Sequence, residues 1–240
     1  MPPRILSYKL ERDDLCERMG GGIPEGSLMV IEGEHGCGKS LLAQRLLAGL
    51  LANGSSVTYV STELTTKGFL LQMQSLDYAI KEGIAREQLV LIPVHPLVGE
   101  RAPPAELLPR LARARMLYEK DVIIFDAFSK FLADHLRATG SSYPATQQID
   151  AVLHLFKRLT SMGKTVILTR ESGQVPDEIM DGFCEAADIL VNLESRLTGS
   201  GTSRRIHVRR MSRAGGRFNE VIGFRAEPGI GIVIEIRAVV

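Results

Sequence analysis

The chain contains no tryptophan, and aromatic residues make up only 5% of it. Its 29 basic and 28 acidic residues leave a formal net charge of +1, so no overall field draws the protein to nucleic acid or to an anionic membrane. The three cysteines, Cys16, Cys37 and Cys184, lie far apart and lack Cys-x-x-Cys spacing. This spacing argues against both a disulfide framework and a zinc site.

Long apolar segments are also missing. No apolar run approaches the roughly 18 residues that a membrane span requires. The N-terminus lacks the charged-then-apolar pattern of a signal peptide. We therefore expect a cytoplasmic protein.

The composition suits one domain with a sizeable core, because 45% of the 240 residues are hydrophobic; we expect residues 1–240 to form it. Apolar segments typical of buried strands alternate with helical segments, which indicates an α/β fold around a parallel sheet. The expected strands cover residues 26–33, 56–62, 88–94, 121–129, 164–169 and 188–194. The expected helices cover residues 40–54, 65–82, 105–120 and 146–163.

The C-terminal part has a different pattern. Apolar segments at 203–211, 221–227 and 231–240 follow one another with only turn residues between them. This predicts antiparallel strands that close one edge of the sheet. Polar loops rich in glycine or proline are expected at 99–104 and 138–145.

A glycine-rich stretch, IEGEHGCGKS, joins the first expected strand to a leucine-rich helix. Its glycines and its Lys-Ser ending, residues 33–40, fill the pattern G-x-x-x-x-G-K-[ST]. In this context the pattern predicts a P-loop, a loop that wraps the phosphates of ATP. Backbone N–H groups attract the phosphates, Lys39 reaches the β and γ phosphates, and the Ser40 hydroxyl binds Mg²⁺. The residues expected to bind ATP here are Gly33, Glu34, His35, Gly36, Cys37, Gly38, Lys39, Ser40 and Leu41.

Two residues of this loop have no assigned chemistry. Cys37 is either a reactive thiol whose pKa is lowered by the helix N-terminus, or a small residue that fits the loop. His35 is equally ambiguous. The sequence leaves both questions open.

Two carboxylates are expected to complete the site. Asp126 ends the apolar run VIIFD, a Walker-B pattern, so we expect Asp126 and Ser40 to hold Mg²⁺. Hydrolysis also needs a carboxylate that orients or deprotonates the attacking water. No acidic residue directly follows Asp126, so Glu63, after the strand at 56–62, is the candidate. It would face the γ phosphate if that strand neighbours the P-loop strand; otherwise it is a solvated strand-end residue.

These motifs, in this order, resemble the RecA-type ATPases and, within them, the KaiC-like group. Residues 20–40 are similar to the group's segment GGIPxGxxxLIxGxxGxGKS, and QSLDY at 74–78 is similar to its Ser-Phe-Gly-Trp-Asp segment. The phrases FRAEPGIGIVIEI at 224–236 and YVSTELT at 59–65 resemble the archaellum accessory ATP-binding proteins of this group.

The resemblance implies a RecA-like P-loop NTPase core that binds ATP between the subunits of a ring, which we expect to be a hexamer. It implies the archaellum motor ATPase FlaI and the membrane protein FlaJ as partners, with contact to the inner face of the membrane only through them. It places Arg210 and Glu227 near the nucleotide of a neighbouring subunit. The group commonly has two adjacent glutamates where Glu63 is followed by Leu64, so slow or absent hydrolysis is expected.

Two other functions stay open: a RecA-type DNA-handling ATPase and an independent KaiC-like ATPase. The six arginines between Arg204 and Arg217 suit phosphate contacts, a protein interface or a solvated strand face. RecA proteins carry a DNA-binding loop in the segment that here runs from Glu171 to Asp188 and is rich in acidic residues. Because these carboxylates repel phosphates, direct contact with nucleic acid is not expected.

Overall fold

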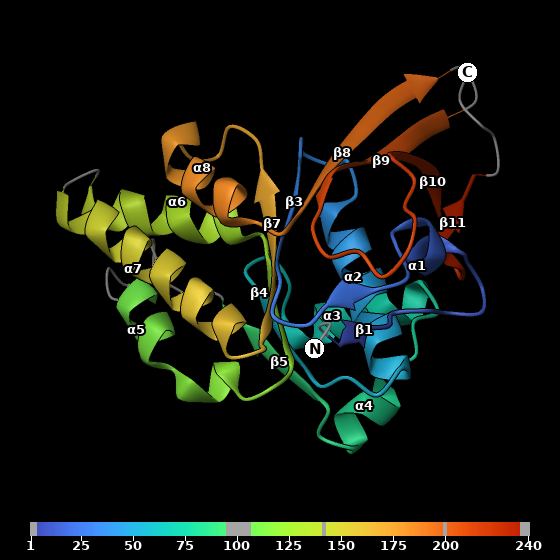
Figure 1. The fold of residues 1–240 in the computed structure, drawn as a ribbon, viewed down its shortest axis with the longest axis horizontal. Coiled ribbons are helices and arrows are strands. Elements are labelled where there is room, and N and C mark those ends of the chain that lie inside the picture. The colour runs from blue at the N-terminus through green and yellow to red at the C-terminus, as the bar shows by residue number, and fades with distance from the viewer. Residues whose placement is uncertain (1–3, 95–106, 141–142, 199–200, 236–240) are drawn as a thin grey trace.

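The computed structural model describes residues 4–94, 107–140, 143–198 and 201–235. Within them, nine strands form a mixed sheet in the order β11-β10-β9-β8-β3-β7-β6-β4-β5 (Figure 1). The strands are β3 Leu28–Gly33, β4 Val57–Ser61, β5 Leu89–Pro93, β6 Val122–Asp126, β7 Thr165–Glu171, β8 Ile189–Thr198, β9 Gly201–Met211, β10 Val221–Glu227 and β11 Gly231–Ile234. The short strands β1 Ile5–Leu6 and β2 Ile23–Pro24 form a separate antiparallel pair.

The strand directions confirm the predicted fold class. From β8 to β5 every neighbouring pair is parallel, whereas β9, β10 and β11 pair antiparallel. Strand β8 joins the two parts, because it is parallel to β3 on one side and antiparallel to β9 on the other. The C-terminal strands therefore extend the sheet at one edge, as the sequence predicts.

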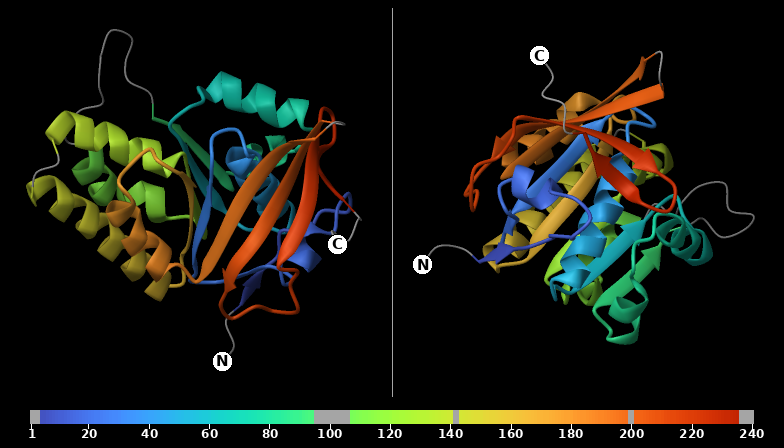
Figure 2. Two further views of the ribbon diagram at one scale, coloured as in Figure 1. Left: turned by 90° about the horizontal axis from the view of Figure 1, so that it is seen from above. Right: turned by 90° about the vertical axis from the view of Figure 1, so that its right-hand side faces the viewer.

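Helices cover both faces of the sheet. Figure 2 shows the two helical layers in two further views of the molecule. On one face lie α1 Leu15–Arg18, α2 Lys39–Ala52, α3 Thr66–Ser75 and α4 Lys81–Ala85. On the other lie α5 Leu107–Arg113, α6 Phe128–Thr139, α7 Tyr143–Ser161 and α8 Asp177–Ala186, with a 3-10 helix, η1, at Arg115–Tyr118. Each face has its own cluster of buried apolar side chains.

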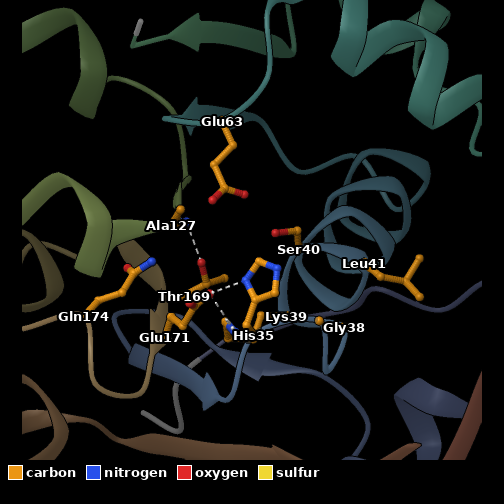
Figure 3. A pocket seen from close by; sticks show the side chains of 11 residues that line it. His35, Gly38, Lys39, Ser40, Leu41, Glu63, Ala127, Thr169, Glu171 and Gln174 are labelled. Atoms are coloured by element: carbon orange, nitrogen blue, oxygen red, sulfur yellow. Dashed lines mark hydrogen bonds and ion pairs between the residues drawn. The ribbon is translucent and has the colours of Figure 1, made fainter. Parts of the chain in front are cut away.

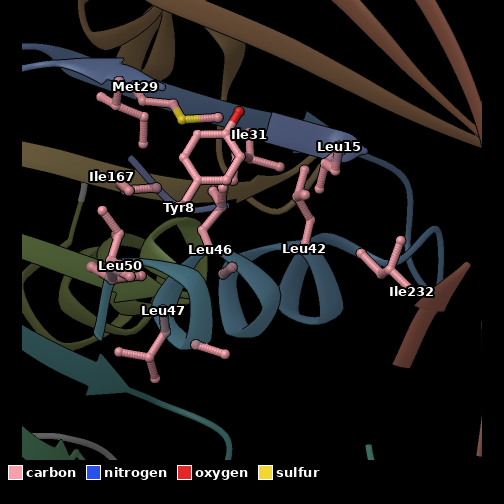
Figure 4. Packing of buried hydrophobic residues seen from close by; sticks show 14 of the residues in the cluster. Tyr8, Leu15, Met29, Ile31, Leu42, Leu46, Leu47, Leu50, Ile167 and Ile232 are labelled. Atoms are coloured by element: carbon pink, nitrogen blue, oxygen red, sulfur yellow. The ribbon is translucent and has the colours of Figure 1, made fainter. Parts of the chain in front are cut away.

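Helix α2, which starts at the P-loop, is the centre of the first cluster. Figure 4 shows leucines of α2 packed against Met29 and Ile31 of β3, together with Tyr8 and Ile232 of the same cluster. Fully burying a leucine side chain stabilises a fold by about 1.5–3 kcal/mol. This packing holds the first turn of α2 at the end of β3.

The N-terminal segment is attached to α2 by a buried ion pair. Arg45 Nε and Nη2 donate to the Asp13 carboxylate at 2.7 and 2.6 Å, and Nη1 donates to the Tyr8 carbonyl at 2.9 Å. The Arg45 and Asp13 side chains are 0% and 1% exposed. A Cβ at Gly49 would lie 2.1 Å from the same carbonyl, so glycine is what allows the segment to approach α2.

The helix predicted over 65–82 is wrong in its length. Helix α3 ends at Ser75, and Asp77 takes the left-handed conformation with φ 54° before α4 begins. The turn directs Tyr78 inward, where its hydroxyl accepts a 2.9 Å hydrogen bond from the Ile232 N–H. The chain breaks the helix to bury this side chain.

Two further boundaries differ from prediction. Of the helix expected over 105–120, the described part is split into α5 and η1. The loop expected over 138–145 consists largely of helix ends: Gly140 ends α6 with φ 73°, and α7 begins at Tyr143. Pro144 is compatible with this start because the first turn of a helix needs no N–H donor there. The loop expected over 99–104 lies outside the described residues.

Candidate functional site

The predicted P-loop lies between β3 and α2, at the carboxyl ends of the parallel strands (Figure 3). Gly36 and Gly38 take positive φ angles of 73° and 106°, which other L residues rarely adopt. A Cβ at Gly33 would lie 2.4 Å from the Leu193 carbonyl oxygen, so that position also requires glycine. The loop borders a cavity of about 220 Å³ lined by His35, Gly36, Gly38, Lys39, Ser40, Leu41, Glu63, Ala127, Thr169, Glu171 and Gln174.

Lys39 points back across the loop. Its Nζ donates to the carbonyls of Glu34 at 2.6 Å and Gly33 at 3.1 Å. The Glu171 carboxylate lies 3.6 Å from the same nitrogen. The ammonium group is thus held at the cavity wall, where it can reach a phosphate by rotating its side chain.

Asp126 is 3% exposed and is hydrogen-bonded to two residues that line the cavity, Ser40 and Thr169. Its carboxylate accepts hydrogen bonds from the hydroxyls of Ser40 at 2.9 Å, Tyr59 at 2.8 Å and Thr169 at 3.0 Å. Burial raises the pKa of the Asp126 carboxyl above its usual value, while these three donors oppose the rise. The structure thus joins the two residues that the sequence predicts as Mg²⁺ ligands.

The backbone after Asp126 is strained. Ala127 takes the left-handed conformation with φ 59°, which costs a non-glycine residue about 1–2 kcal/mol. Its N–H donates to Thr169 Oγ1 at 2.6 Å, so the hydroxyl that binds Asp126 also fixes this turn. The turn ends β6 at Asp126 and starts α6 at Phe128, where the sequence predicts a strand that continues to residue 129.

Glu63 lines the cavity, although the strand before it does not lie next to the P-loop strand. Strand β4 does not neighbour β3; β7 and β6 lie between them. Glu63 lies beyond the end of β4, and Figure 3 shows its exposed carboxylate pointing across the cavity toward Ser40 and Ala127. The condition that β4 neighbours β3 is therefore wrong, yet Glu63 still lines the cavity. Its role toward a phosphate stays a prediction.

Sequence reasoning missed Glu171 as a site residue. It is the last residue of β7, next to the P-loop strand, and its Oε2 lies 3.2 Å from His35 Nδ1 and 3.6 Å from Lys39 Nζ. The available signal was an acidic residue at the end of an apolar strand, the same signal that identifies Asp126. In the sequence, Glu171 is one of several acidic residues that are expected to repel DNA.

The structure favours the second interpretation of Cys37. The residue is fully buried, and burial raises the pKa of its thiol despite the nearby Lys39, which acts in the opposite direction. A thiol with a raised pKa is a poor nucleophile at neutral pH. Cys37 therefore fills space under the loop, while His35 is exposed and contacts Glu171.

Arg210 and Glu227 do not line this cavity. Arg210 Nη1 donates to the carbonyls of Cys184, Glu185 and Ala187 at 3.0, 3.1 and 2.8 Å, so it caps the C-terminal end of α8. Glu227, at the end of β10, accepts a hydrogen bond from Arg225 Nε. Their predicted contact with a neighbouring subunit's nucleotide stays a prediction.

Comparison with known proteins identifies the family. A family model described as "ATPase: KaiC" matches residues 11–236. The chain belongs to the KaiC family of ATPases. This KaiC-family chain is 39% identical over 235 residues to the "Archaeal flagellar ATP-binding protein FlaH" of Methanocaldococcus jannaschii, covering 98% of this chain and 97% of the relative. It is 35% identical over 236 residues to the protein of the same description in Methanococcus voltae, covering 98% and 99%.

A solved structure agrees with these relatives. The crystal structure of flagellar accessory protein FlaH from Methanocaldococcus jannaschii matches with a TM-score of 0.88 at 38% identity, covering 98% of this KaiC-family chain and all of the other. The RecA-like fold predicted from the motifs is thus confirmed over nearly the whole chain. Among the described residues, no helix has both the length and the apolar composition to cross a membrane.

Proposed function

We propose that this KaiC-family protein binds ATP with Mg²⁺ in the cavity beside the P-loop. The observation that carries the proposal is the hydrogen bond between Ser40 and Asp126, beside a cavity that Lys39 also lines. The loop's N–H groups and the N-terminus of α2 attract the phosphates, and Lys39 exchanges its backbone carbonyl partners for the β and γ phosphates.

The residues present fit a magnesium ion. Mg²⁺ prefers oxygen ligands, and it usually combines one or two protein oxygens with waters and phosphates. Ser40 offers a hydroxyl and Asp126 a carboxylate, 2.9 Å apart and oriented by Tyr59 and Thr169. When bound, the ion neutralises phosphate charge; Ser40 and Asp126 hold it.

We infer slow or absent hydrolysis from the setting of Glu63. Its side chain lines the cavity, and its N–H donates a 3.4 Å hydrogen bond to Ser61 Oγ. Within the described part of the chain, no hydrogen bond or ion pair holds its carboxylate. A general base accelerates a reaction only when it is held in position. An exposed carboxylate followed by the apolar Leu64 meets that requirement poorly.

We further propose that ATP controls the assembly of a ring, a hexamer, that regulates the motor ATPase FlaI and contacts the membrane through the membrane protein FlaJ on the cytoplasmic side. The names of the full-length relatives support an archaeal flagellar role. ATP that bridges two subunits stabilises only the assembled form, by about 2.7 kcal/mol per site at a hundredfold excess over its dissociation constant.

One experiment tests these proposals together. The molar mass is measured by size-exclusion chromatography with light scattering, with and without ATP and Mg²⁺, and phosphate release is followed on the same sample. We expect ATP-dependent growth in mass with slow phosphate release. Fast release without a change in mass would contradict the assembly function and favour an independent ATPase.

A further inference from the structure

Among the described residues, Glu171 is the only carboxylate that forms an ion pair with Lys39, the lysine of the P-loop. Glu171 Oε2 lies 3.6 Å from Lys39 Nζ and 3.2 Å from His35 Nδ1, so it bridges the tip and the end of the loop (Figure 3). The side chains of Lys39 and Glu171 are 10% and 22% exposed. Solvent therefore screens this pair less than it screens a surface ion pair.

The main chain of Glu171 is held by hydrogen bonds, whereas the partners of its carboxylate in the described part of the chain are His35 and Lys39, both in the loop. The Glu171 N–H donates to Ser129 Oγ at 2.8 Å, and the Ser129 hydroxyl donates to Gln174 Oε1 at 2.7 Å. Residue 171 also ends the ladder between β7 and β3. A change of partner for Lys39 is thus accommodated by rotation of the Glu171 side chain and not by movement of β7.

We propose that Glu171 is a specificity-determining residue that competes with the terminal phosphate of the nucleotide for Lys39. This inference rests on the proposed nucleotide binding. Before binding, the carboxylate neutralises the ammonium group; after binding, it stands beside the negatively charged phosphates and repels them. The repulsion acts more on ATP than on ADP, because ATP carries the additional charge of the γ phosphate, one of the two phosphates that Lys39 is proposed to contact. Glu171 therefore lowers the affinity for ATP more than the affinity for ADP.

The test is calorimetric titration of wild type and Glu171→Gln with ATP and with ADP, both in Mg²⁺. The variant keeps the side-chain shape and removes the charge. We expect about tenfold tighter ATP binding, because one negative charge a few ångströms from the phosphates, partly screened by solvent, has an effect of about that size. We expect a smaller gain in affinity for ADP. The gain in ATP affinity shrinks with added salt. Glu171→Ala is measured as a second neutral variant, and thermal unfolding checks that both variants are folded.

The matched control is Glu178→Gln, which removes the same charge from an exposed position in the first turn of α8. We expect it to leave the ratio of ATP to ADP affinity unchanged. An unchanged ratio in both neutral Glu171 variants, or weaker ATP binding, overturns the inference while the proposed function stands. Absence of ATP binding in the wild type contradicts the proposed function itself and the inference with it.

Discussion

The Ser40 hydroxyl donates a 2.9 Å hydrogen bond to Asp126, a residue 86 positions further along the chain. The bond links the first turn of α2 to the end of β6 across β7, which lies between β3 and β6 in the sheet. The two proposed ligands of Mg²⁺ are thus already adjacent in the fold. The metal site requires no rearrangement of strands.

Replacing Lys39 by alanine is expected to weaken ATP binding by at least about tenfold, because hydrogen bonds to a charged group contribute about 1.5–3 kcal/mol each. The fold should persist, since the hydrogen bonds of Lys39 Nζ go to residues of the loop itself. Calorimetric titration and circular dichroism measure the two effects. Unchanged affinity would remove the P-loop assignment.

Asp126→Asn should have opposite effects on stability and on binding. Burial raises the pKa of Asp126 in the folded state, so its stabilising contribution is present below its unfolded pKa, about 4, and is lost as the pH rises through the folded pKa. As the pH rises and Asp126 ionises in the folded state, its buried charge destabilises the fold, whereas asparagine carries no such charge. We expect the melting temperature of the nucleotide-free variant, relative to that of the wild type, to increase as the pH rises from about 4. A difference that does not depend on pH would contradict this prediction.

The same variant should lose part of the Mg²⁺ dependence of ATP binding, because a neutral amide is a weaker ligand for the ion. Titrations with ATP, at a series of Mg²⁺ concentrations, measure this loss. Identical titrations for wild type and variant would exclude Asp126 from the metal site.

Glu63→Gln is expected to leave ATP affinity unchanged and to lower any turnover. General base catalysis typically accelerates a reaction by about 10²- to 10⁴-fold. Because Glu63 is poorly held, we expect the wild type to hydrolyse on the order of one ATP per minute or fewer. Phosphate release under single-turnover conditions measures both proteins. Equal rates would show that Glu63 is not the base, and many turnovers per second in the wild type would contradict slow hydrolysis.

Arg45→Met should destabilise the protein by about 3–5 kcal/mol, because it leaves the Asp13 carboxylate buried without its partner. Urea unfolding gives the free energy. In the double variant Arg45→Met, Asp13→Leu both charges are gone, so we expect a smaller loss than in Arg45→Met alone. A surface-like loss below 1 kcal/mol in the single variant would mean that the pair is not buried in solution.

Arg210→Ala should lower the free energy of unfolding by about 1 kcal/mol, because three carbonyls at the end of α8 lose their donor. The neighbouring exposed Arg209→Ala is the control and should be close to neutral. If Arg210 also contacts a neighbouring subunit's nucleotide, the variant will in addition reduce the ATP-dependent gain in molar mass. No change in either quantity would show that neither role holds.

The P-loop and Asp126 could be predicted from the sequence because each depends on a local pattern. A glycine run between a strand and a helix, and an aspartate at the end of an apolar run, have the same meaning wherever the strands lie in the sheet. The position of Glu63 relative to the P-loop is harder to predict from the sequence, because it depends on strand order. Long-range packing sets that order and brings β7 and β6 between β3 and β4.

Glu171 shows the same limit. Its contact with Lys39 exists because β7 pairs with β3, a pairing that no short segment of the sequence specifies. The interrupted helix after β4 has another cause: Tyr78 is buried against β11, and this tertiary contact overrides the local helical pattern. The start of α6 depends on one left-handed residue, Ala127, whose type gives no sign of that conformation.

Gly38 lies against the C-terminal strands: a Cβ there would come 3.2 Å from the Phe224 ring of β10. The glycine-rich loop and β10 are therefore packed closely, and their side chains have to fit one another. A chimera that takes its first half from one relative and its C-terminal strands from another places against this loop a side chain, at the position of Phe224, that comes from a different protein. Exchanges between relatives should instead keep Phe224 and the P-loop from the same parent, with the crossover points in the helices of the opposite face.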